Sequence, residues 1–163
     1  MKLIPLSKGL FAKVDDEDFE YLNSFKWYAQ AGGKRFYAAT SYYDIKTQIS
    51  YVYYMHRIIM KPLKNLTVDH INHDPLDNQK SNLRVCTGKQ NLWNKDTSLN
   101  TKKSSKYKGV HARRNGFQAT IRKGGKCYFL GDFKEEDEAA KAYDEKAKEL
   151  FGEFASLNFN KNL

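Results

Sequence analysis

Side chains that could bind a metal ion or move a proton are concentrated in one stretch, VDHINHDPLDNQKSNLRVCTGKQN, at residues 68–91. Asp69 supplies a carboxylate, His70 an imidazole and Asn91 an amide oxygen. Oxygen ligands of this kind hold hard divalent cations, and a neutral imidazole can take a proton from water. His70 with His73 also suggests a zinc site, but the chain has no C-x-x-C pair and no further well-spaced histidine to complete one.

The same stretch contains the elements that must position these groups. Asp69 and His70 lie where an expected strand ends in a polar loop rich in turn-forming residues. LRVCT at 83–87 predicts a second strand, and T-x-x-Q at 87–90 predicts a capped helix start just before Asn91. The order strand, loop, strand, helix can bring the carboxylate and the imidazole against the amide, so that a metal, a water and a phosphate meet between them.

The first 60 residues predict strands, a helix and a hairpin. Apolar alternation at 4–14 favours strands, and helical spacing behind an acidic first turn predicts a helix over about 16–26. The aromatic and β-branched stretch 34–60 predicts a hairpin that turns near 44–47. Its tyrosines could stack on DNA, but we expect most of them in the hairpin core and in cross-strand pairs. His56 is either catalytic support or a satisfied histidine beside a strand, and we favour the second interpretation.

A polar stretch, NKDTSLNTKKSSK at 94–106, predicts a linker before a second module. Three alternating segments after it, YKGVHAR, GFQATIRK and KCYFLGDF, are separated by tight turns and followed by an amphipathic helix that stops at Gly152. This pattern predicts a three-stranded antiparallel sheet packed on one helix. Strand alternation places one set of side chains on the face turned away from the helix: His111, Arg113, Gln118, Thr120, Arg122 and Phe129.

Charge and composition indicate a protein that binds polyphosphate. The net charge is +9, and residues 105–134 alone hold 8 basic side chains and 1 acidic one, whereas residues 135–163 hold 4 and 8. Such clustering is typical of a nucleic-acid-binding face. No apolar run is long enough to span a bilayer and no secretory signal is visible, so we expect a cytoplasmic protein. Cys86 and Cys127 are expected to be reduced and buried or half-buried.

The first module resembles the HNH nucleases, in particular the homing endonucleases of phages and introns. The resemblance rests on DH at 69–70, DN-x-x-SNLR at 77–84 and Q-N-x-x-N at 90–94, in the variant whose final histidine is asparagine. It extends over most of residues 1–95 and implies a ββα-metal fold.

This resemblance assigns roles to individual residues. Asp69 and Asn91 would hold one magnesium or manganese ion per active site, and His70 would be the general base. Asn82 would brace the loop and so position His70. Arg84, Asn94 and His73 could contact phosphate, although their polarity alone also explains them at a surface.

The second module resembles the APETALA or ethylene-response-factor type of DNA-binding domain. YKGV at 107–110, ATIR at 119–122, YFLGDF at 128–133, DEAAKAYD at 137–144 and LNF at 157–159 carry this resemblance. It implies a sheet in the major groove of DNA, with the outward side chains named above and Lys108 at the interface. Phe129 replaces the family's usual tryptophan, and His111 and Thr120 also differ, so no target sequence can be transferred.

Together these observations predict an α+β protein with three parts. Residues 1–95 would form the nuclease domain, with its core at about 66–95; residues 96–105 would be the linker, and residues 106–163 the second DNA-binding domain. The expected function is site-specific, metal-dependent cleavage of double-stranded DNA, with no membrane or small-molecule cofactor involved and with a monomer expected. The alternative is an inactive transcriptional regulator built from the same domains. A third interpretation, RNA binding, lacks a clear platform for stacking single-stranded bases.

Overall fold

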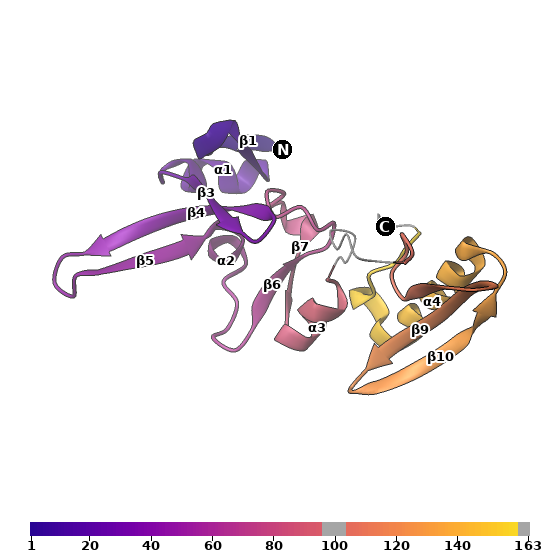
Figure 1. Ribbon diagram of the computed structural model, residues 1–163. Coiled ribbons are helices and arrows are strands. Elements are labelled where there is room, and N and C mark those ends of the chain that lie inside the picture. Colours follow the sequence, from indigo (N-terminus) through magenta and orange to yellow (C-terminus); the bar gives the residue numbers. More distant parts are fainter. Residues whose placement is uncertain (96–103, 160–163) are drawn as a thin grey trace. The chain divides into compact units, whose positions relative to one another are not determined.

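The computed structural model describes residues 1–95 and 104–159 of the chain (Figure 1). The chain divides into two compact units, Met1–Gly88 and Lys89–Leu163, and both mix helices with small antiparallel sheets. Most of the predicted linker, 96–105, lies outside the described residues. Ser105, at its end, is buried and donates its hydroxyl to Glu136 at 2.6 Å. No helix in the described part of the chain is long and apolar enough to cross a membrane.

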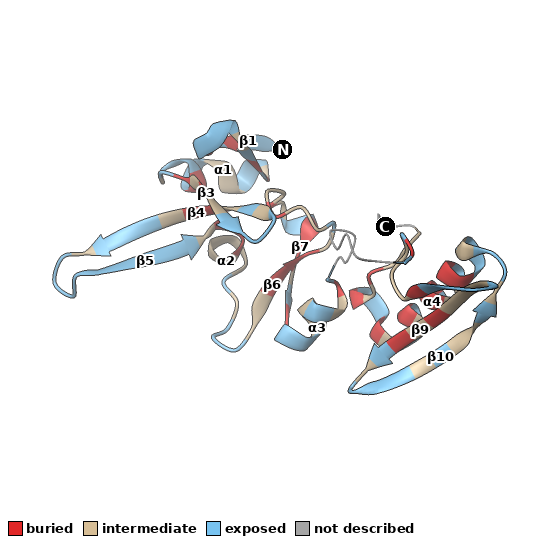
Figure 2. Cartoon of the chain, viewed as in Figure 1, coloured by how far each residue is buried: buried red, intermediate tan, exposed pale blue. Residues whose placement is uncertain are grey.

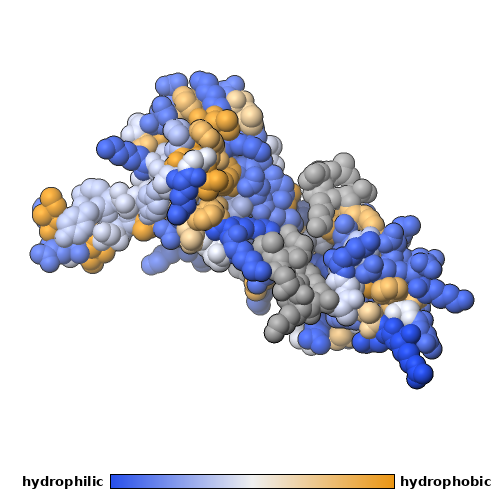
Figure 3. Space-filling view, turned by 45° about the horizontal axis from the view of Figure 1, so that its top comes forward, coloured by the Kyte–Doolittle hydropathy of each residue, from blue (hydrophilic) through white to orange (hydrophobic). Residues whose placement is uncertain are grey.

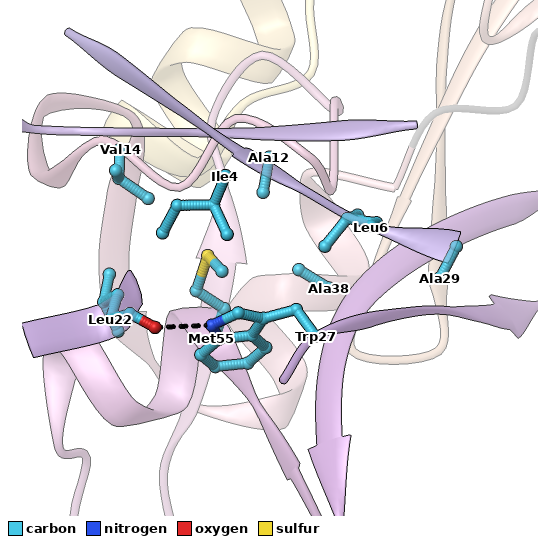
Figure 4. Close-up of a cluster of buried hydrophobic side chains, with 9 residues drawn as sticks. All are labelled: Ile4, Leu6, Ala12, Val14, Leu22, Trp27, Ala29, Ala38 and Met55. Carbon is cyan, nitrogen blue, oxygen red and sulfur yellow. Dashed lines mark hydrogen bonds between the residues drawn. The ribbon is translucent and has the colours of Figure 1, made fainter. Parts of the chain in front are cut away.

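The first unit begins with a two-stranded sheet packed on a helix. Strand β1 (Lys2–Pro5) leads through the short helix η1 (Ser7–Gly9) to its antiparallel partner β2 (Phe11–Val14), and α1 (Asp16–Asn23) follows. Ile4, Ala12, Val14 and Leu22 from these elements form part of the core in Figure 4, together with five residues from other segments: Leu6, Trp27, Ala29, Ala38 and Met55. The helix ends at Asn23, earlier than the expected end near residue 26. The Trp27 indole donates a hydrogen bond to the Leu22 carbonyl at 2.7 Å, and the Ser24 hydroxyl donates one to the Tyr21 carbonyl, so side chains bind the carbonyls at the helix end.

A three-stranded sheet continues the first unit, in the order β3 (Tyr28–Gly32), β4 (Arg35–Asp44), β5 (Ile49–Tyr54). Strand β3 pairs only with Arg35–Ala39 of β4. From Thr40 to Tyr53 the hairpin is therefore a two-stranded ribbon, which we call the arm (Figure 1).

The arm's side chains are exposed on both faces. Tyr42 and Tyr43 are neighbours on one strand and so point to opposite faces, yet they are 61% and 55% exposed. The expected cross-strand pairing is confirmed by Tyr42 opposite Tyr51, but the expected hairpin core is wrong, because a third strand stops before the arm begins. Figure 2 shows the arm almost entirely exposed, and Figure 3 shows apolar side chains near its end.

The segment expected to continue the hairpin instead forms helix α2 (Met55–Met60). Met55 is fully buried, and Lys61 ends the helix in the left-handed conformation, with φ 43°. The free energy gained by burying Met55 and His56 in the core is larger than the local preference of this segment to continue the strand. His56 itself lies in this helix, but its ring stacks on Tyr54, the last residue of β5, so the expectation that it lies beside a strand is confirmed.

The stretch singled out for its chemistry forms a strand, a loop, a strand and a helix. Strand β6 (Thr67–His70) pairs antiparallel with β7 (Leu83–Cys86), and the intervening loop, 71–82, ends in the short helix η2 (Lys80–Asn82). Helix α3 (Gly88–Trp93) begins directly after Thr87, where the capping motif places it. The division between the two units falls within this helix.

The second unit contains a sheet of β8 (Val110–Arg113), β9 (Gly116–Lys123) and β10 (Lys126–Phe133), in the order β10-β9-β8. Helix α4 (Glu136–Phe151) packs on one face of the sheet through Ala139, Tyr143 and Ala147, and the short helix η3 (Gly152–Phe154) follows. Gly109, with φ 75°, lies against the Tyr143 ring so closely that a Cβ atom would come within 2.0 Å of it. Both cysteines are free, but Cys127 is exposed, because it lies on the open face of the edge strand β10.

Candidate active site

The loop at 71–82 is irregular, but it is held from three sides. Strand β2 contacts it through backbone hydrogen bonds, from Lys13 N to Leu76 O and from Asn78 N to Lys13 O, both 2.8 Å. The Asp15 carboxylate accepts two hydrogen bonds, one from the Lys80 backbone amide at 2.7 Å and one from the Gln79 side chain at 3.1 Å. The Arg35 guanidinium donates to His73 O at 2.6 Å. Residues distant in sequence thus fix the loop that follows Asp69 and His70.

Asp69 and His70 are adjacent at the end of β6, and both residues are buried. Arg84 stands opposite Asp69 in the sheet and donates from Nε and Nη2 to Asp69 Oδ2, at 2.9 and 2.7 Å. This charge-assisted contact fixes the orientation of the carboxylate. Contact of Arg84 with a phosphate stays a prediction.

The His70 ring is enclosed by aromatic groups and by one amide. Its Nε2 atom lies 3.3 Å from Asn78 Oδ1. The His56 ring meets it edge to face at 5.0 Å between centroids, and the Tyr37 ring lies 6.3 Å away. Burial lowers the pKa of His70, although the hydrogen bond to Asn78 and the nearby Asp69, Asp74 and Asp77 carboxylates oppose this effect. His70 is therefore a neutral imidazole at neutral pH.

His56 is a second buried imidazole, at 8% exposure. It stacks on Tyr54 at 5.6 Å, and among the described residues its Nδ1 atom has no hydrogen-bond partner. Burial, helped by His70 and Arg57, lowers its pKa to about 3. His56 is therefore a neutral imidazole that packs against His70. Among the described residues its ring is not fully hydrogen-bonded, which differs from the expectation of a satisfied histidine.

Asn82 connects the two ends of the loop. Its Oδ1 atom accepts the Asn72 amide at 2.9 Å, and its Nδ2 atom donates to Asp77 O at 2.8 Å. Asn72 in turn accepts the Asp74 amide through Oδ1. These contacts are those of a side chain that braces a loop.

Asn91 lies in α3, beyond the point where the chain divides, so its place beside Asp69 stays a prediction. Asp69, as a buried carboxylate oriented by Arg84, fits a hard cation that prefers oxygen ligands. Within residues 1–95 and 104–159, no three histidine, cysteine, aspartate or glutamate side chains gather as a metal cluster.

In the second unit, the outward face of the sheet is mostly polar. His111, Arg113, Arg122 and Phe129 are exposed there, and Gln118 and Thr120 are half-buried beside them. Arg113 donates to Gln118, and the Thr120 hydroxyl lies 3.3 Å from His111 Nε2. We call this surface the outer sheet face.

Two other expected DNA contacts lie elsewhere in the second unit. Asn94 is 3% exposed, which does not favour contact with DNA. The Lys108 ammonium donates to the carbonyls of Trp93 and Lys95, at 3.0 and 3.1 Å, and so caps the end of α3. Contact of either residue with DNA stays a prediction.

Sequence reasoning missed the residues that support the site, namely Lys13, Asp15, Arg35 and Asn78. In the sequence, the DN pair at 77–78 stands out only as part of a motif. The cross-strand pair of Asp69 with Arg84 could have been found by pairing the two predicted strands, because opposite charges across a ladder attract.

The candidate site thus combines a buried carboxylate and a buried imidazole at the end of β6 with a loop held by side-chain hydrogen bonds. The family model described as HNH endonuclease matches residues 53–92. The chain is 36% identical over 157 residues to an uncharacterized HNH endonuclease, L560, of Acanthamoeba polyphaga mimivirus, covering 96% of this chain and 79% of the relative. No solved structure matches the chain significantly. The chain belongs to the HNH endonuclease family. It is therefore a nuclease, and its family suggests that DNA is the substrate.

Proposed function

We propose that the chain is a site-specific, divalent-metal-dependent DNA endonuclease of the homing type, with a ββα-metal active site formed by β6, β7 and α3. The observation that carries this proposal is the adjacent pair Asp69 and His70, both 7% exposed, at the end of β6. A carboxylate fixed by Arg84 and an imidazole kept neutral by burial are suited to binding a cation and to accepting a proton, respectively.

In the proposed mechanism, His70 takes a proton from the water that attacks the scissile phosphate. Asp69 and the Asn91 amide oxygen would hold one magnesium or manganese ion, which would supply positive charge to offset the negative charge that develops on the phosphate and on the departing 3′ oxygen. Asn82 keeps the loop, and with it the His70 ring, in position.

We further propose that the second unit is an ethylene-response-factor-like domain that binds double-stranded DNA through the outer sheet face. Its exposed arginines, Arg113 and Arg122, support this proposal, because guanidinium groups contact both phosphates and guanine edges. The acidic first turn of α4, Glu136–Glu138, belongs to the helix that packs against the other face of the sheet. Of the two faces of this sheet, the outer sheet face is therefore the one that suits a polyanion.

The decisive experiment measures cleavage of supercoiled plasmid DNA by the purified protein, with and without magnesium. We expect cleavage that depends on magnesium and a rate at least about 10²-fold lower for His70→Ala, since a general base contributes about 10²–10⁴-fold. A filter-binding assay shows whether the variant still binds DNA.

Two results would count against the proposal. If the wild-type protein binds DNA but never cuts it, the chain is the inactive DNA-binding regulator weighed above. Equal cleavage by the wild-type protein and by a folded His70→Ala variant would remove His70 from the mechanism.

A further inference from the structure

Asn78 is the most deeply buried polar residue near the proposed base. It is 1% exposed and lies in the middle of the loop at 71–82. A buried amide needs hydrogen-bond partners for its side chain, because leaving such a group unpaired costs about 1–3 kcal/mol. The partners that Asn78 has therefore explain why an amide is present in the core.

The two ends of the Asn78 side chain have different partners. Nδ2 can only donate, and it points to Pro75 O at 3.4 Å. Oδ1 can only accept, and it lies 3.3 Å from His70 Nε2. In a neutral imidazole one nitrogen carries the proton and the other carries the lone pair. An acceptor facing Nε2 stabilises the tautomer with its proton on Nε2, which leaves the lone pair on Nδ1.

The amide cannot turn easily to present its donor end instead. Its backbone N–H donates to Lys13 O at 2.8 Å, so strand β2 fixes the main chain at this position. Turning the side chain by half a rotation would bring Oδ1 against the Pro75 carbonyl and Nδ2 against His70, and two acceptors would then face each other. The network therefore selects one orientation of the amide.

We propose that Asn78 is a positioning residue that holds His70 in the Nε2–H tautomer, so that Nδ1 is the atom that takes the proton from water. The His56 and Tyr37 rings pack against the same imidazole and leave it little freedom to rotate. The proposal rests on the proposed role of His70 as the base, but the tautomer can be measured without any cleavage.

The test is nitrogen-15 NMR of the histidine rings in the full-length protein at neutral pH, with and without magnesium. We expect a pyrrole-like Nε2 and a pyridine-like Nδ1 for His70 in the wild-type protein. Asn78→Leu keeps the branched shape of the side chain but lacks the acceptor, so its His70 signals should move toward the average of the two tautomers. Asn78→Asp keeps an acceptor at the same place and should restore the wild-type pattern.

The cleavage rates of the variants should follow the same order as their His70 tautomers: the wild-type protein first, then Asn78→Asp, then Asn78→Leu. We expect kcat for Asn78→Leu to fall about tenfold or more, within the general-base contribution of about 10²–10⁴-fold, while KM for DNA changes little. Asn78→Asp should recover part of the loss. Asn72→Ala is the matched control, because the Asn72 side chain also makes hydrogen bonds in this loop, but with Asp74 and Asp77.

Several outcomes would overturn the proposal. A wild-type His70 with its proton on Nδ1, or with mixed tautomers, rejects it even if Asn78→Leu fails to fold. A folded Asn78→Leu variant with an unchanged tautomer and unchanged kcat also rejects it. If the tautomer behaves as expected but His70→Ala still cuts DNA, the positioning contact stands and only the base role is wrong.

Discussion

At the scale of single residues, the two facing imidazoles in the first unit make its stability depend on pH. His56 has a folded-state pKa of about 3, and the unperturbed value in an unfolded chain is about 6.5. Between these values the unfolded chain binds a proton that the folded chain does not. The free energy of unfolding must therefore fall as the pH drops below about 6.5, approaching about 1.4 kcal/mol for each pH unit.

This dependence can be tested by urea unfolding at several pH values between 7 and 4. We expect His56→Leu to flatten the acid loss of stability of the first unit, since the variant has no imidazole to protonate. His111→Gln, which removes an exposed histidine from the other unit, is the control and should leave the slope of the first unit unchanged. A His56→Leu variant as acid-sensitive as the wild-type protein would contradict the burial argument.

The placement of Asp69 and His70 at a strand end could be predicted from the sequence because it depends on local order. A carboxylate and an imidazole at a strand end, followed by a loop, a strand and a capped helix, form a pattern that spacing reveals. Asn78 could not be distinguished in the same way. The loop has many Asx residues, and only its folded path decides which of them meets His70.

At the scale of elements, Asp15, the residue before α1, makes contacts that the sequence does not predict. The sequence suggests that the acids there stabilise the helix N-terminus, but the Asp15 side chain makes no capping hydrogen bond. It instead binds the loop more than 60 residues later, at Gln79 and Lys80. No periodicity reports such a contact, because it depends on how β2 packs beside the loop.

Asp15→Ala should therefore affect the active-site loop more than the helix. We expect the unfolding free energy of the first unit to fall by about 1–2 kcal/mol, the scale of hydrogen bonds to a charged group at a partly exposed site. The cleavage rate should also fall. Glu20→Ala removes an exposed acid from the same helix and should change neither quantity. Equal effects of the two variants would show that only the charge of α1 matters.

Helix α2 was missed for a related reason. Its residues MHRIIM follow a run of strand-forming residues, and local preference alone continues that strand. The turn into the helix at Met55 buries a methionine and the His56 ring in the core. Tertiary packing therefore decides the conformation, and a short segment carries too little periodicity to reveal it.

At the scale of the whole molecule, the proposal assigns chemistry to one unit and much of the DNA affinity to the other. The basic side chains at 105–134 contribute to DNA affinity in this way only if the outer sheet face contacts DNA. The order of strands and helix in the second unit could be predicted from alternation and turn residues, since each strand is short and bounded by glycine or asparagine. Which bases the face would recognise depends on side-chain contacts that the sequence does not contain.

Arg122→Ala should weaken binding to duplex DNA and reduce the slope of log affinity against log salt by about 1, if the guanidinium contacts a phosphate. Lys141→Ala is the matched control, because Lys141 is an exposed cation on α4, the helix behind the sheet. Fluorescence anisotropy at several salt concentrations measures both quantities. If the two variants bind alike, the outer sheet face is not the interface.

The contrast between the arm and the loop at 71–82 has a consequence for local opening of the first unit. The arm is regular but two-stranded and exposed on both faces, and an isolated hairpin is marginally stable in water. The loop is irregular, yet the amides of Asn78 and Lys80 are bound by β2 and by Asp15. We expect deuterium to replace the arm's amide protons first and that of Asn78 much later. The active-site loop would then be among the last parts of this unit to open, even though it lies outside any strand.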